Sequence, residues 1–288
     1  MAVGTYALTT LTNLKTYLGV ADTDDDTLLE NLIDRATAFV ESYCDRKIME
    51  RDFYEWHDGP RGRTLQVTNW PINRVYVVAT GVANAFKIEA TVASDLFNTV
   101  SNINDEFMVY RMDSSGTVTS NTTWDLTNPD FNTTTKLIAA IDSQTGWDAT
   151  QSTNISTRWL HQVAGIDVSG TSFSFTYPSN TEQVFRIERD AGCIYLRRDP
   201  SWPEDHYDSP NLPSTRSSIL VHYQGGFTTV PADVEQACIE VAAQFYERRE
   251  HDSNLQSESL GDYSYSLRGP EEGLESIQRL LQPYKNVR

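Results

Sequence analysis

Three aspartates at alternate positions, Asp22, Asp24 and Asp26, have the most metal-like spacing in this chain. Calcium loops open with oxygen ligands at their first, third and fifth positions. Such a loop also needs Gly at its sixth position and Glu at its twelfth, whereas this chain has Thr27 and Ile33 there. We therefore interpret the cluster as a solvated helix start, because carboxylates favour the positive N-terminal end of a helix.

The histidines and cysteines do not have the spacing of a metal or nucleophile site. No HxH, HExxH, CxxC, GxSxG, P-loop or GxGxxG pattern occurs, so the sequence predicts no metal, no cofactor and no catalytic residue. A hydrolase with an unrecognised pair of carboxylates stays open, because 40 acidic residues must place some carboxylates close together. The residues considered are His57, His161, His206, His222, His251, Cys44, Cys193 and Cys238.

Three tryptophans in the middle of the chain, Trp124, Trp147 and Trp159, allow two interpretations. They can form a platform that binds sugar, or they can fill the core of a small β module. The sequence leaves both possibilities open, although core filling is the more common role of such residues.

The charge of the chain limits its partners. The 288 residues carry a formal net charge of −17, and they contain no lysine- or arginine-rich run. Proteins that bind phosphate groups tightly need such basic patches, so strong binding to nucleic acid or to an anionic membrane is disfavoured. An acidic surface is compatible with DNA that slides past without sticking. No apolar run approaches the ~20 residues of a membrane span, and no secretory signal is visible.

Helical patterns occur at both ends of the chain. A first helix is predicted over Thr10–Leu18, with Gly19 as its left-handed C-terminal cap. A second helix is predicted to start after Thr23, which forms a capping pattern with Asp26. A third is predicted to begin near Pro231, a residue suited to the first helical position. A polar, extended segment follows over residues 251–269, and a terminal helix over 270–282.

The region between these helices has the character of short strands. The predicted strands, with one short helix over Lys136–Asp142, are Thr64–Thr68, Val75–Ala79, Phe86–Ala90, Phe107–Met112, Ser172–Tyr177, Val184–Glu188, Ile194–Arg197 and Ile219–Tyr223. Residues 82–182 are rich in Thr, Asn and Ser and poor in Lys and Arg. The predicted fold class is therefore α+β. Residues 1–80 and 184–288 form a small helical bundle frame with short strands, and residues 81–183 form an inserted, mostly-β module.

Four segments resemble the head–tail connector proteins of tailed phages, also called adaptors or head-completion proteins. They are LTNLKTYLGVADTDDDTLLENLIDRATAFVESYCDRKI, TLQVTNWPINRVYVV, SSILVHYQGGFTTVPADVEQACIEVAAQFYERRE and SESLGDYSYSLRG with LLQPYK. The resemblance covers roughly residues 5–80 and 184–285. The main departure is the β-rich insert, where the family normally has a short connection.

The resemblance implies a virion structural protein without catalytic activity. It would form a ring, usually of twelve copies, between the portal and the tail or neck protein, after assembly in the host cytoplasm. Genome DNA would pass through its channel without sequence-specific binding, and no membrane would be involved. The alternative function is a carbohydrate- or protein-binding module carried by the β insert.

The resemblance also suggests which residues bind the portal or a neighbouring subunit. An extended arm can add a strand to the sheet edge of a partner, and tyrosines are frequent interface anchors. The predicted partner-binding residues are Leu260, Tyr263, Tyr265, Leu267, Leu274, Ile277, Leu281 and Tyr284. Deletion of Ser257–Arg288 is expected to leave the helical core folded and to abolish attachment to capsids.

Overall fold

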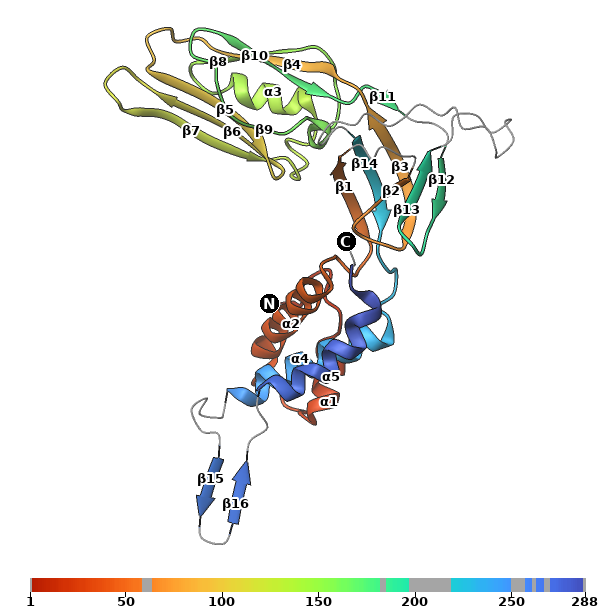
Figure 1. Ribbon diagram of the computed structural model, residues 1–288. Coiled ribbons are helices and arrows are strands. Elements are labelled where there is room, and N and C mark those ends of the chain that lie inside the picture. The colour runs from red at the N-terminus through yellow and green to blue at the C-terminus, as the bar shows by residue number, and fades with distance from the viewer. Residues whose placement is uncertain are drawn as a thin grey trace, which may run out of the picture.

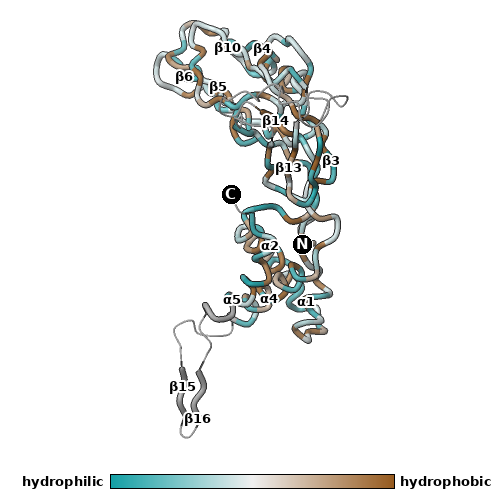
Figure 2. The backbone as a smooth tube through the Cα atoms, turned by 45° about the vertical axis from the view of Figure 1, so that its right-hand side comes forward, coloured by the Kyte–Doolittle hydropathy of each residue, from teal (hydrophilic) through white to brown (hydrophobic). Residues whose placement is uncertain are grey.

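The computed structural model describes residues 2–58, 64–181, 185–196, 219–249, 257–260, 263–266 and 270–286. The protein is α+β, and all strand pairings within its described sheets are antiparallel. Four of the five described helices lie together toward one end, and a β module that contains the fifth helix lies at the other. Two further sheets, which together contain fewer residues than the sheets of the module, lie between them (Figures 1 and 2). The described helices are α1 (Leu11–Leu18), α2 (Asp26–Cys44), α3 (Thr134–Asp142), α4 (Ala232–Arg248) and α5 (Pro270–Leu281), with 3-10 turns η1 (Thr157–Trp159) and η2 (Gln282–Tyr284).

The first two helices show how far local signals determine helix ends. The Thr10 side chain accepts a hydrogen bond from the Asn13 amide (3.2 Å), and Gly19 caps α1 in the left-handed region, as predicted. The capping pattern predicted for α2 is wrong. Its N-cap is Asp25, which makes no side-chain capping bond, and the helix begins at Asp26.

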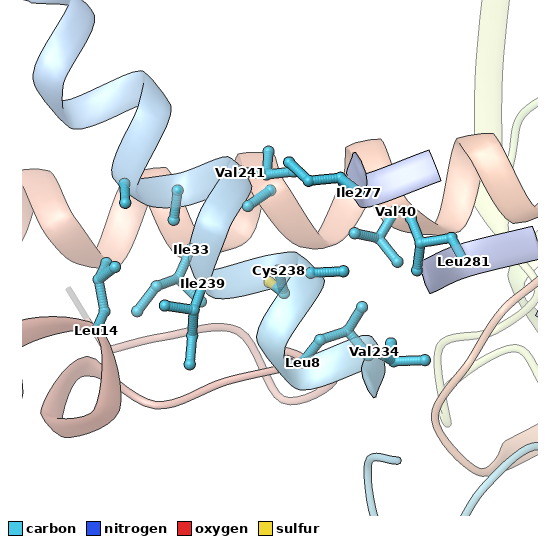
Figure 3. Packing of buried hydrophobic residues seen from close by; sticks show 14 of the residues in the cluster. Leu8, Leu14, Ile33, Val40, Val234, Cys238, Ile239, Val241, Ile277 and Leu281 are labelled. Carbon is cyan, nitrogen blue, oxygen red and sulfur yellow. The ribbon is translucent and has the colours of Figure 1, made fainter. Parts of the chain in front are cut away.

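Four of the helices share one apolar cluster (Figure 3). α4 packs against α1, α2 and α5, because each helix presents apolar residues at three- and four-residue steps. α4 begins at Ala232, so Pro231 is its N-cap rather than its first helical residue. The fully buried members of the cluster include Leu8, Leu14, Leu29, Ile33, Val40, Val234, Cys238, Val241, Ile277 and Leu281.

Two sheets lie next to the helices and enclose a second apolar cluster. One has the strand order β1-β14-β3-β11 and the other β12-β13-β2. Ile219, Val221 and Tyr223 of the central strand are buried between these sheets. The bounds are β1 (Arg51–His57), β2 (Thr64–Gln66), β3 (Ile72–Thr80), β11 (Asn180–Thr181), β12 (Phe185–Glu188), β13 (Cys193–Leu196) and β14 (Ile219–Gly225).

The β module forms a third cluster, whose members come from residues 85–175. One sheet has the order β7-β6-β5-β9, the other β10-β4-β8, and α3 packs against β8. Leu137, Ile138 and Ile141 of α3 are buried, as predicted. The bounds are β4 (Ala83–Ala90), β5 (Phe97–Ile103), β6 (Glu106–Met112), β7 (Val118–Asp125), β8 (Trp147–Gln151), β9 (Val163–Asp167) and β10 (Ser172–Tyr177).

All eight of the predicted strands are present, and strands rich in polar residues are among those that were missed. Ser172–Tyr177 was predicted with the bounds that the structure has. Outside the C-terminal arm, six strands were missed: β1, β5, β7, β8, β9 and β11. In β7 the only buried residue is Trp124, so Thr, Ser and Asn fill positions where a strand pattern needs apolar residues.

Candidate interaction surfaces

The terminal helix belongs to the core of its own chain. Ile277 and Leu281, two of the predicted partner-binding residues, have no exposed surface and lie in the cluster of the four helices. Tyr284 is half-buried, and its ring meets Phe227 edge-on at 5.9 Å. These contacts fix α5 and η2 within the chain, so Ile277 and Leu281 are not available at the surface.

The segment after α5 is also held by α2. The amide of Asn286 donates to the carbonyl of Cys44 (2.8 Å), and the Lys285 ammonium lies 4.9 Å from the Tyr43 ring. Deletion of residues 257–288 would therefore remove part of the core along with the arm. The sequence-based expectation that such a truncation leaves the helical core folded conflicts with this packing.

The predicted arm contains a two-stranded hairpin. β15 (Ser257–Leu260) pairs with β16 (Tyr263–Ser266), and Leu260 lies opposite Tyr263 in the register. Tyr265 is in β16, Leu267 lies outside the described residues, and for Leu274 only the backbone of α5 is described. Isolated two-stranded hairpins are marginally stable in water, so this element gains from an additional partner.

A buried carboxylate connects the helices to the sheets. Glu41 of α2 pairs with the Lys47 ammonium and the Arg51 guanidinium, both at 2.7 Å, and accepts from the Ile48 amide (3.3 Å). The Lys47 amide in turn donates to Asn69 Oδ1 (2.7 Å). This network fixes the path of the chain from α2 into β1.

Arg46 lies at the same junction and is an exception to the rule that buried charges are paired. Its guanidinium carbon is 3.5 Å from the Trp70 ring centroid and 5.5 Å from that of Phe227. None of its three guanidinium nitrogens has a hydrogen-bond acceptor among the described residues. Burial lowers the pKa of Arg46 to about 10, so the charge is retained at neutral pH.

A second buried carboxylate, Glu55, lies between the two smaller sheets. It accepts from the Tyr223 hydroxyl (2.5 Å), the Thr68 amide (3.0 Å) and Asn69 Nδ2 (3.0 Å), and His57 Nε2 lies at 3.2 Å. Burial alone would raise the pKa of Glu55, but these donors outweigh it and hold the pKa below its usual value. The arrangement is that of a satisfied structural carboxylate.

Two carboxylates at the start of α2, Asp25 and Asp26, form ion pairs with basic side chains. The Lys15 ammonium pairs with Asp26 (2.5 Å) and also donates to the Asp22 carbonyl, and Arg249 pairs with Asp25 (2.9 Å). Within the described ranges, no group of three or more His, Cys, Asp or Glu residues could hold a metal ion.

The tryptophans of the module do not form a common platform. Trp124 and Trp147 are buried in the module core, where Trp124 packs at 6.2 Å from Phe107. Trp159 is half-buried in η1. Core filling is therefore the correct interpretation for Trp124 and Trp147, and the platform interpretation is wrong.

A sheet face on the module that carries exposed apolar side chains was missed by the sequence interpretation. Residues that pair across β5, β6 and β7 lie on the same face of the sheet. Its four rows are Phe97, Met112 and Val118; Thr99, Tyr110 and Asn121; Ser101, Met108 and Thr123; and Ile103, Glu106 and Asp125. Phe97, Met108 and Val118 are exposed, and charged side chains occur only in the row of Glu106 and Asp125. The large apolar or aromatic side chains at positions 108, 110 and 112 of β6, a period of two, are the signal that could have identified this face.

Among the residues that the structure describes, no helix combines the length and the apolar character that a membrane span requires.

Comparison with known proteins gives one family match. Residues 8–109 match the model described as phage gp6-like head-tail connector protein. This confirms the family resemblance drawn from the N-terminal helices and the strand–proline–strand segment, and it continues into the module as far as Val109. The match does not reach residues 184–285, so the resemblance there stays a prediction.

Solved structures give weaker likenesses. A chain in the neck of an empty GTA particle, computed with C6 symmetry, is 13% identical with a TM-score of 0.41, covering 100% of this chain and 95% of that chain. A chain in the neck of a native GTA particle, computed with C12 symmetry, is 14% identical with a TM-score of 0.42, at 100% and 93% coverage. A chain in the virion of a native gene transfer agent particle is 14% identical with a TM-score of 0.40, at 100% and 94% coverage. Sequence identities and TM-scores this low carry no conclusion about the partners of this chain. Comparison with curated proteins gives no significant match.

Proposed function

We propose that this chain, whose residues 8–109 match the phage gp6-like head-tail connector model, is a head-tail connector and forms part of the neck between the capsid and the tail. The family match is the observation that carries this conclusion. Connectors are structural proteins of the virion, so the role is architectural and not enzymatic.

The assembly that we propose is a ring of copies, twelvefold as is usual for connectors, at the portal vertex. Ring contacts are heterologous, so each copy must offer two different complementary surfaces. The portal protein would lie on one side of the ring and a tail or neck protein on the other. The net charge of −17 supports a channel along which DNA slides without binding, because like charges repel.

Within the chain we propose a division of labour between a frame and a module. The frame consists of residues 1–80 and 184–288, and the module of residues 81–183. In support, the module core is built from residues 85–175 alone, whereas the clusters of the helices and smaller sheets draw on both sides of the module in the sequence. The frame would make the ring and portal contacts, and the module would extend from it.

The partner-binding residues that we retain are all except the two that are buried in the core of the helices. They are Leu260, Tyr263, Tyr265, Leu267, Leu274 and Tyr284, whereas Ile277 and Leu281 hold α5 in the core. A hairpin with two edges can accept a strand from the portal or from a neighbouring copy. Tyrosines in such a position supply contact area with little loss of side-chain entropy.

The proposed location is tested by imaging. Portal-bearing capsids that lack the connector are incubated with the full chain and examined by negative-stain electron microscopy. We expect added density with rotational symmetry at the portal vertex. Capsids that acquire no such density, although the chain is folded, would contradict the connector role.

The role of the hairpin requires a variant that leaves α5 in place. The double substitution Tyr263→Ser with Tyr265→Ser removes the aromatic side chains of β16 and keeps the chain length. We expect it to lose attachment to capsids with no change in thermal stability, whereas Ser264→Ala in the same strand attaches normally. Normal attachment by the double variant would assign portal binding to another surface.

The alternative function, a binding module carried by the insert, keeps one supporting observation. The exposed apolar side chains on the face of β5, β6 and β7, which include Phe97, Met108 and Val118, are the kind of surface that marks a protein contact. Phe97→Lys with Met108→Lys would place charges on this face without entering the core. If the module binds a neck or capsid protein, this double variant still reaches the portal vertex but recruits less of that protein in pull-down assays with purified components.

A further inference from the structure

A row of aromatic rings crosses the outer face of the β1-β14-β3 sheet. His222 of β14 stacks on Tyr54 of β1, with ring centroids 4.0 Å apart and planes 15° from parallel. Its other neighbour is Tyr76 of β3, at 4.6 Å and 36°. Each tyrosine also lies near an arginine: Arg158 is 4.0 Å from the Tyr54 ring, and Arg74 is 5.3 Å from the Tyr76 ring.

Arg158 makes this row a contact between two parts of the molecule. It belongs to η1 of the β module, and its guanidinium forms two hydrogen bonds with Asp105 in the turn between β5 and β6 (3.0 and 2.8 Å). The row therefore runs from the module, through Tyr54, into the central strand of the frame sheet. A second contact lies beside it, where the module's His161 meets Trp56 of β1 at 4.9 Å.

The position of His222 favours a neutral imidazole. Its Nε2 is buried and has no hydrogen-bond partner among the described residues. A proton on this atom would leave a buried, charged donor without an acceptor, which is costly. The faces of the tyrosine rings would attract an imidazolium. Each ring already lies near the guanidinium of an arginine, however, and that positive charge opposes a second one.

The charged and titratable groups around His222 act in opposite directions. Tyr54 and Tyr76 pack against its ring, and Asp52 of β1 and Arg158 of the module act on it as charges. Arg74 and Asp105 lie one contact further away, on Tyr76 and Arg158 respectively. Burial lowers the pKa of His222, Asp52 opposes this shift, and Arg158 reinforces it; the pKa lies below the ordinary value. The undocked state thus binds a proton more readily than the docked state.

We propose that the row Arg158, Tyr54, His222 and Tyr76 is an acid-sensitive latch that fixes the β module against the frame sheet. At neutral pH the stacked rings hold Arg158, and with it the module, in one orientation. As the pH falls through and below the ordinary pKa of histidine, about 6.5, proton uptake favours states in which the imidazole has left the row. The module then pivots on the chain segments that connect it to the frame. This inference does not depend on the connector role.

The test measures the orientation of the module in the full chain. Spin labels are placed at two exposed positions, Arg35→Cys in α2 and Ser174→Cys in β10, in a Cys193→Ser background. Pulsed dipolar spectroscopy then gives the distribution of distances between them at pH about 7.5 and about 5. We expect a single narrow peak at the higher pH and loss of that peak at the lower pH.

Two substitutions separate the latch from a general acid effect. His222→Phe keeps a ring in the row but cannot take up a proton, so it should retain the narrow peak at both pH values. Arg158→Ala breaks the row at its module end and should lose the peak at both, while circular dichroism shows a folded chain. Lys87→Ala, in an exposed ion pair of the module, serves as the control and should behave as the parent.

Three outcomes would overturn the proposal. The first is that the distance distribution of the His222→Phe variant broadens on acidification, as that of the parent does. The second is that Arg158→Ala keeps the narrow peak at neutral pH. The third is that His161→Phe, and not His222→Phe, removes the acid response, which would assign the titration to the contact with Trp56.

Discussion

The guanidinium of Arg46 stacks on the indole of Trp70 at the junction between the helices and the sheets, with 3.5 Å between the guanidinium carbon and the ring centroid. A desolvated cation–π contact contributes about 2 kcal/mol. A buried charge without a partner costs several kcal/mol. On these magnitudes the cost exceeds the gain, so we expect Arg46 to destabilise the isolated chain.

Replacing Arg46 by an apolar residue of similar length should therefore stabilise the protein. For Arg46→Met we expect an increase of about 1 to 4 kcal/mol in the free energy of unfolding, as for other buried charges replaced by apolar side chains. Urea denaturation measures the change. Arg35→Met, at an exposed position of α2, is the control and should change stability little. A lower stability for Arg46→Met would mean that the contact with Trp70 outweighs the burial of the charge.

Gly146 leaves room for a buried ion pair in the module. Arg111 pairs with Asp95 at 2.7 Å, and their side chains are 6% and 2% exposed. A Cβ on Gly146 would come within 1.7 Å of Arg111 Nη1, and the residue has a φ of +89°. For Gly146→Ala we expect the free energy of unfolding to fall by about 3 to 5 kcal/mol, because the Arg111 guanidinium must leave the Asp95 carboxylate.

Gly116 is the matched control for this substitution. Its φ is +83°, and no atom lies within 4 Å of a Cβ built there. Gly116→Ala should cost only the backbone strain of about 1 to 2 kcal/mol. Thermal unfolding of the two variants separates strain from steric displacement. If both variants lost the same stability, Arg111 would be able to move away from the new methyl group without an energetic cost.

Glu55 should make the stability of the chain sensitive to acid. Its pKa is held below the ordinary value in the folded state, so its contribution is present above the unfolded pKa of about 4.3 and is lost as the pH falls through the folded pKa. Glu55→Gln should therefore flatten the fall in unfolding free energy below that pH. Urea denaturation over a pH series tests this, with the exposed Glu106→Gln as the control. An unchanged slope in Glu55→Gln would mean that other carboxylates dominate the acid response.

Ile277 and Leu281 should behave as core residues. Truncation of either to Ala removes a fully buried side chain, and such changes cost about 2 to 5 kcal/mol. Arg279→Ala, between them on the solvent side of α5, should cost well under 1 kcal/mol as a surface change. Chemical denaturation of the isolated chain gives these values. If Ile277→Ala left stability unchanged but weakened capsid attachment, the residue would belong to the partner surface as the sequence suggested.

Local signals in the sequence were sufficient where the structure depends on near neighbours. The ends of α1 follow from Thr10 and Gly19, whose hydrogen bonds reach only a few residues along the chain. The strand Ser172–Tyr177 follows from alternating aromatic and polar residues. The α+β class and the resemblance of residues 8–109 to the connector family were likewise predicted, because they depend on the order and spacing of such segments.

The tertiary structure decided which surfaces face inward. Ile277 and Leu281 have the spacing of an amphipathic helix, which indicates an apolar face but not whether that face meets its own chain or another. The tryptophans of the module carry the same ambiguity, and the packing of Trp124 and Trp147 resolved it. The row formed by Tyr54, His222 and Tyr76 joins residues far apart in the sequence. Periodicity reports only the local direction of each side chain, so such a row appears only once the strands are paired.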